Sequence, residues 1–296
     1  MKFISRNLKY IATAFFTAAI GISATTAFAQ APSVKANVKT GYEHKDKDKG
    51  FCQNWNWSSD NKVSFADLRE LTAAAGGTIT VDAGKNGGVS VVGEDRNDVA
   101  IKACIQAWGT TEEAAKAAAA GIRINTSGTI KAESSVDENW SVSFQLTVPR
   151  QSNLKLNAHN GGISIANVDG MIDFETQNGG VSLENLAGDV TGSTKNGGLN
   201  VMLAGTSWRG NGLNATTTNG GVNLTLSKNY SANLETGTVN GGYKSDIPAL
   251  NITTEEIKGG WKTRPTRIQT NLNGGGAPVK VITTNGGIKI NAVENE

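Results

Sequence analysis

The sequence predicts an all-β protein: a parallel β-solenoid (β-helix) with a small N-terminal α+β cap region that contains one helix. The tripeptide Asn-Gly-Gly occurs eight times, and successive copies from Asn160 to Asn196 are 18 residues apart. Alternating apolar and polar residues follow most copies, which is the pattern of a short strand with one buried face. A near-fixed period that tolerates insertions is typical of a repeat architecture, and stacked repeats form extended surfaces.

The N-terminus has the pattern of an export signal. Three basic residues precede an apolar run over residues 11–22, and the Ala-Phe-Ala at 27–29 matches a small-x-small cleavage site. Residues 1–29 are therefore expected to be a Sec-type signal peptide, and residues 30–50 a flexible leader. Since no later stretch is apolar enough to cross a bilayer, we expect no transmembrane segment in the mature chain. The sequence leaves open whether the exported protein is periplasmic or extracellular at the cell surface.

The charge of the mature chain argues against a nucleic-acid partner. The whole sequence has 28 basic and 26 acidic residues, a net charge of +2. The expected signal carries three of the bases and no acid, so 25 bases remain against 26 acids, and the net charge becomes −1. Nucleic-acid binding usually needs a basic stripe.

Residues 51–150 form the expected cap region, which lacks the repeat. Its one predicted helix covers residues 111–120, with Thr111 as N-cap and acidic residues in the first turn. The region holds both cysteines, Cys52 and Cys104. In an oxidising compartment an even pair favours a disulfide, which would stabilise the fold by roughly 4 kcal/mol in the chain-entropy model.

Residues 151–296 form the expected repeat region. Its copies follow the pattern N-G-G-apolar-x-apolar, and in five copies a threonine lies two residues before the asparagine. Because glycine takes backbone angles that other residues avoid, we expect a sharp corner at each copy, with asparagine side chains bonded along the stack. The expected turn residues are Asn160, Gly161, Gly162, Asn178, Gly179, Gly180, Asn196, Gly197, Gly198, Asn219, Gly220 and Gly221.

Two architectures fit this pattern. In a solenoid each 18-residue unit is one coil, and Ile163, Val181, Leu199 and Val222 stack in one column. In an antiparallel meander each Asn-Gly would instead be a hairpin turn. The solenoid is favoured because near-identical units suit like-on-like stacking.

The ordered set of motifs resembles a bacterial family of unknown function labelled "putative adhesin". The matching stretches are residues 89–96, residues 143–150, the Asn-Gly-Gly copies and residues 208–222, and the resemblance covers roughly residues 75–290. It implies a glycine-rich β-solenoid, and it implies fold better than activity. The cysteine pair and the pair Trp55 and Trp57 depart from what the family leads us to expect.

No catalytic, cofactor or metal site is expected. His159 stands at a position that varies between copies, as a solvent-facing corner would. The acids Asp169, Asp173, Glu175, Glu184 and Asp189 are scattered, as on a solvated surface. The G-G-x-G-x-D repeat of calcium-binding β-rolls is absent from the sequence.

Trp55 and Trp57 have two interpretations. Lying two residues apart, they would share one face of a strand, and an exposed pair can stack on sugar rings as a ligand contact. The alternative is that they plug the open end of the solenoid.

These patterns together predict an exported, non-enzymatic, adhesin-like or cell-envelope scaffold. Its partners would be envelope glycan, peptidoglycan or a surface protein. The alternative is a periplasmic carbohydrate-active enzyme, a polysaccharide lyase or hydrolase on a β-helix. Paired carboxylates in a cleft would favour the enzyme, and flat faces of serine, threonine and asparagine favour the scaffold.

Overall fold

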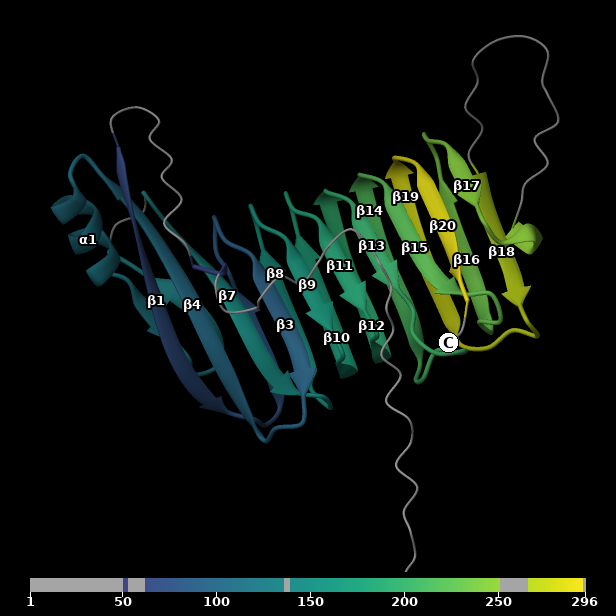
Figure 1. Cartoon of the computed structure of the whole chain (residues 1–296), viewed down its shortest axis with the longest axis horizontal. Helices are drawn as coiled ribbons and strands as arrows, with labels where there is room; N and C mark the ends of the chain where they lie inside the picture. Colours follow the sequence, from purple (N-terminus) through teal and green to yellow (C-terminus); the bar gives the residue numbers. More distant parts are fainter. Residues whose placement is uncertain (1–49, 53–61, 136–138, 251–265, 295–296) are drawn as a thin grey trace, which may run out of the picture. The chain divides into compact units, whose positions relative to one another are not determined.

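The computed structural model describes residues 50–52, 62–135, 139–250 and 266–294. This part of the chain is mostly β, with two ten-stranded, largely parallel sheets and one α-helix, α1 (Glu112–Ala120) (Figure 1). The expected signal peptide and most of the expected leader lie outside the described residues, as do Trp55 and Trp57. No helix in the described ranges is long and apolar enough to cross a membrane.

Each sheet has a defined strand order. In sheet A the strands lie in the order β1 (Val63–Ala74), β4 (Asp98–Gly109), β7 (Trp140–Pro149), β3 (Val89–Glu94), β9 (Ile163–Ala166), β11 (Val181–Glu184), β13 (Leu199–Met202), β15 (Val222–Ser227), β20 (Ile288–Val293) and β17 (Tyr243–Ser245). In sheet B the order is β18 (Thr266–Leu272), β16 (Ala232–Thr238), β19 (Pro278–Asn285), β14 (Gly212–Asn219), β12 (Ala187–Asn196), β10 (Asp169–Thr176), β8 (Asn153–Ala158), β2 (Thr78–Asp82), β6 (Thr129–Glu133) and β5 (Arg123–Asn125). A short 3-10 helix, η1 (Pro248–Leu250), follows β17.

The register of the repeats is parallel, and the predicted column of apolar residues is confirmed. Val181 pairs with Ile163 on one side and with Leu199 on the other, and Leu199 pairs with Val222. All four side chains are at most 3 % exposed and belong to one core that draws on both sheets. These pairings exclude the antiparallel meander for these repeats, and parallel sheets with stacked asparagine ladders are typical of a β-solenoid.

The order of the strands in space departs from their order in the sequence at both ends of the stack. The C-terminal strands β19 and β20, yellow in Figure 1, lie between β14–β15 and β16–β17. Similarly β2 and β3 lie between β6–β7 and β8–β9. The expected boundary at residue 151 therefore does not coincide with the start of parallel pairing, because β2 and β3 already pair in parallel with β8 and β9.

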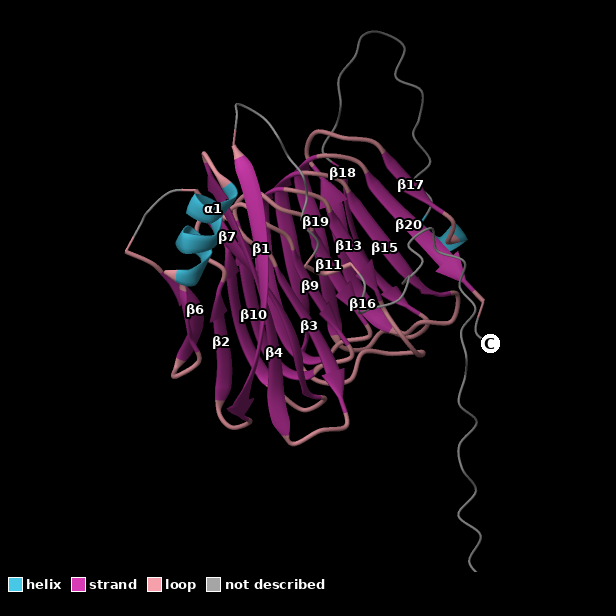
Figure 2. Ribbon diagram, turned by 60° about the vertical axis from the view of Figure 1, so that its left-hand side comes forward, coloured by secondary structure: helices cyan, strands magenta, loops and turns pink. Residues whose placement is uncertain are grey.

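The helix α1 is confirmed within the predicted range. Thr111 is its N-cap, and its hydroxyl accepts a hydrogen bond from the Ala114 backbone N–H. Ala115 and Ala119 are buried, and the helix packs beside β1 and β4 (Figure 2). Arg69 on β1 donates hydrogen bonds to the carbonyls of Ala119 and Ile122, which fixes the C-terminal end of the helix to the sheet.

Candidate functional site

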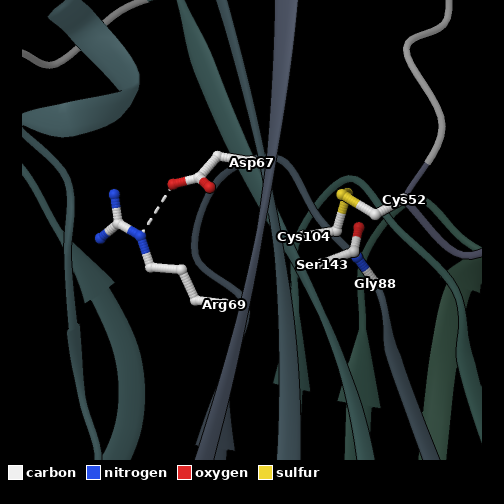
Figure 3. The surroundings of a disulfide bond; sticks show 6 residues. All are labelled: Cys52, Asp67, Arg69, Gly88, Cys104 and Ser143. Atoms are coloured by element: carbon white, nitrogen blue, oxygen red, sulfur yellow. Dashed lines mark hydrogen bonds and ion pairs between the residues drawn. A yellow bond between two sulfur atoms is a disulfide. The ribbon is translucent and has the colours of Figure 1, made fainter. Parts of the chain in front are cut away.

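The predicted disulfide is present. Cys52 and Cys104 are joined, with their Cα atoms 5.3 Å apart (Figure 3). On β4, Cys104 lies between the buried residues Ala103 and Ile105, and successive side chains of a strand point to opposite faces. The Cys104 side chain therefore points away from the core, on the other face of sheet A. The bond therefore attaches residues 50–52 to the outer face of that sheet.

The residues considered for catalysis lie on the surface and do not converge. His159, Asp173, Glu175, Glu184 and Asp189 are exposed, and Asp169 is half-buried. Within the described part of the chain, no group of three or more His, Cys, Asp or Glu side chains is placed to hold a metal ion.

Seven of the eight Asn-Gly-Gly asparagines form one continuous ladder. From the second asparagine of the ladder onward, each side-chain amide donates to the side-chain oxygen of the preceding asparagine, at 2.7–3.0 Å. Along the stack the order is Asn86, Asn160, Asn178, Asn196, Asn219, Asn285 and Asn240. The ladder follows the order in space, so the C-terminal copy at Asn285 stands between Asn219 and Asn240.

The eighth copy is not a rung. Asn273 has a φ of 46°, and its amide donates to the carbonyls of Lys228 and Tyr230. Three glycines at positive φ follow it, so this copy makes a turn between β18 and β19. A third glycine after the tripeptide is the sequence signal that sets this copy apart.

The glycines of the rungs have a different role from the one predicted. None of the twelve predicted turn residues has a positive φ, so strained backbone angles are not the reason for Gly-Gly. The first glycine of each pair instead lies directly on the backbone of the neighbouring coil. A Cβ on Gly179 would stand 2.0 Å from the Gly161 carbonyl oxygen, whereas a Cβ on Gly180 would meet nothing nearer than the Gly198 oxygen at 3.5 Å.

The threonine two residues before the asparagine completes the contact between coils. The buried hydroxyls of Thr176 and Thr194 donate to the carbonyls of Gly161 and Gly179, both at 2.7 Å. Thr217, Thr238 and Thr283 make the same bond to the first glycine of the adjacent rung. The Asn-Gly-Gly edge is therefore bonded within the stack, and its recurring residues are explained by packing.

A groove of about 730 Å³ lies on the outer side of sheet B, across β12, β14, β19, β16 and β18. One row of neighbouring outward residues runs along it: Thr191, Asn214, Lys280, Glu235 and Gln269. Next to this row, Gly212 lies beside Asp189, and Pro278 packs directly over it, because a Cβ on Gly212 would stand 2.5 Å from the Pro278 carbonyl oxygen. Asn211, Asn233 and Asn271 add further amides to the lining.

Glu235 is the best-buried charged side chain of the groove, with 20 % of its side chain exposed. Arg267 donates a hydrogen bond to its carboxylate, and the Lys280 ammonium lies 3.5 Å from the same oxygen. Burial acts to raise the pKa of Glu235, but Lys280, Arg267 and a hydrogen bond with Gln269 outweigh it and hold the pKa of this carboxyl below its ordinary value. Glu235 is thus held as an anion and is not a proton donor at neutral pH.

Sequence reasoning did not identify this groove. Of its residues, the sequence singles out only Asp189, as one of the acids expected on a solvated surface. The groove depends on β19 lying between β14 and β16, an order that the repeat pattern does not contain.

No protein-family model matches the chain, and no curated protein matches it in sequence. Solved structures do resemble it. A "putative cell adhesion protein" from Clostridium sporogenes is 12% identical with a TM-score of 0.40, and the match covers 77% of this chain and 100% of that one. A "putative adhesin" from Bacteroides fragilis is 13% identical with a TM-score of 0.27, covering 77% and 97%. A "putative lipid binding protein" from Parabacteroides distasonis is 10% identical with a TM-score of 0.29, covering 76% and 96%. At these scores the neighbours carry no argument about function.

Proposed function

We propose that this chain is an exported, non-enzymatic, adhesin-like or cell-envelope scaffold, built as a β-solenoid, that binds its partner through an outer face. The observation that carries the proposal is the groove on sheet B, which lies on strands held in a fixed register by the buried core. Binding sites placed on such regular strands are held more precisely than sites on loops. The partners we propose are envelope glycan, peptidoglycan or a surface protein.

Export is supported by two independent features. The first 29 residues have the pattern of a signal peptide, and the chain contains a disulfide between Cys52 and Cys104. Disulfides persist in oxidising compartments outside the cytoplasm.

The alternative of a polysaccharide-cleaving enzyme is disfavoured by the placement of the groove's carboxylates. Glycosidases use two carboxyl groups about 5–10 Å apart. Asp189 on β12 and Glu235 on β16 are three strand spacings apart, which puts their backbones about 14 Å from each other. Glu235 is also bonded to Arg267, so it is not available as a general acid.

The proposal is tested with the purified mature chain and isolated envelope fragments of a bacterium that carries the protein. Co-sedimentation measures binding, and a reducing-end assay on the same sample measures cleavage. We expect the protein to sediment with the fragments without any rise in reducing ends. A time-dependent release of reducing ends would contradict the scaffold and favour the enzyme.

A further inference from the structure

We propose that the groove on sheet B is the binding site of an uncharged, linear glycan, which lies across the strands from β12 to β18. This inference rests on the function proposed above and names the ligand class of its site. The groove volume of about 730 Å³ lies within the range of small-ligand sites. Five strands set the length: the row from Thr191 to Gln269 covers four strand spacings, or about 19 Å.

The side chains of the groove match hydroxyl groups. Carboxamides carry both a donor and an acceptor, and threonine hydroxyls can act as either, so such a surface can satisfy a ligand whose hydroxyls also do both. Asn214, Gln269 and Asn271 are exposed in the groove, and Thr191 is exposed at its end on β12. These groups come from three different strands, β12, β14 and β18, so they can contact successive units of one extended ligand.

The charges of the groove favour an uncharged ligand over a polyanion. Glu235 is neutralised by Lys280 and Arg267, so these two cations are engaged with a carboxylate of the protein itself. Asp189 adds a further negative charge to the lining. An anionic glycan would meet no surplus of positive charge here, and repulsion by Asp189 would weaken its binding.

The shape of the groove shows where to block it. Asn214 is an outward residue of β14 and lies between Thr191 and Lys280 in the row along the groove. An arginine in place of Asn214 would place a longer side chain in the groove. Because Asn214 is exposed, the substitution is expected to leave the core intact.

A matched control lies on the opposite sheet. Ser164 is an exposed, outward residue of β9 in the middle of sheet A, so Ser164→Arg makes the same kind of change away from the groove. Gln269→Ala on β18 is a second groove variant that removes an amide without adding bulk. Thermal unfolding of all three variants shows whether they fold.

The probes are uncharged hexasaccharides of glucose, xylose, mannose and N-acetylglucosamine, with heparin and polygalacturonate as polyanions. They are displayed at high density on an array, because the described lining residues include no aromatic side chain and the affinity of a single site is expected to be modest. We expect at least one uncharged hexasaccharide to bind. Asn214→Arg should weaken that binding at least tenfold and Gln269→Ala at least threefold, with Ser164→Arg unchanged.

Several results would overturn the inference without touching the proposed function. Binding only to the polyanions would refute the charge argument. A loss of binding in Ser164→Arg but not in the groove variants would put the site on sheet A. Sedimentation with envelope fragments without binding to any probe would remove the glycan from the groove and leave a scaffold, whereas hydrolysis of a probe would contradict the scaffold itself.

Discussion

The two glycines of one rung should respond in opposite ways to the same substitution. In Gly179→Ala the new Cβ would stand 2.0 Å from the Gly161 oxygen and 2.4 Å from the Gly161 carbonyl carbon. Both are backbone atoms of a bonded coil, so relief requires the two coils to move apart. Gly180→Ala would place its Cβ 3.5 Å from the nearest atom, an ordinary contact.

The magnitudes follow from these distances. Overpacking typically costs 1–3 kcal/mol, and because the clash at Gly179 is with backbone we expect about 3 kcal/mol of lost stability. At Gly180 the φ is not positive, so alanine should stabilise by up to about 1 kcal/mol by restricting the unfolded chain. The free energy of unfolding is measured by urea denaturation of both variants and wild type. For a domain of this size, 3 kcal/mol lowers Tm by roughly 6–12 °C.

The comparison separates two explanations of the repeat. If the glycines of this rung are needed for close approach, only Gly179, the first of the pair, is sensitive. Equal losses at Gly179 and Gly180 would refute this and return the explanation to special backbone angles or to ligand contact.

Three further predictions concern the disulfide, the ladder and the groove. Replacing Cys52 and Cys104 with serine should lower the free energy of unfolding, measured by urea denaturation, by about 4 kcal/mol. When the mature wild type is treated with an alkylating agent under denaturing, non-reducing conditions, its mass should not change, because neither cysteine is a free thiol. Asn178→Ala removes two amide hydrogen bonds of the ladder and should lower the free energy of unfolding by about 1 kcal/mol. Gln177→Ala in the same rung should change it by no more than about 0.5 kcal/mol. Equal losses of stability in the two variants would contradict a stabilising role for the ladder. The pKa of Glu235 is lowered by folding, so its contribution to stability is present above its ordinary value of 4.5 and is lost as the pH falls through the lower folded-state pKa. Wild type should therefore lose more stability below about pH 4.5 than Glu235→Gln does, and identical pH profiles would show that its ion pairs do not matter.

The sequence predicted the central coils well because their contacts are local in the repeat. From β9 to β15 each rung pairs with the next rung in the sequence, so one period and one apolar alternation define both register and core. The pattern repeats the threonine that makes the hydrogen bond between coils, but the sequence does not indicate that the partner is the carbonyl of the first glycine of the neighbouring rung.

The ends of the stack could not be predicted in the same way. An Asn-Gly-Gly copy is compatible with any neighbouring copy, so periodicity cannot show that the rung at Asn285 bonds to Asn219 and Asn240. The groove depends on that order, because it brings Lys280 beside both Asn214 and Glu235.

A crystal structure of the mature chain with its best-binding uncharged hexasaccharide tests the central claim most directly, because it reports both the place and the integrity of the ligand. The account predicts an intact glycan across β12, β14, β19, β16 and β18, with hydrogen bonds to Asn214 and Gln269. A glycan found on another face, or a cleaved product in this groove, would contradict it.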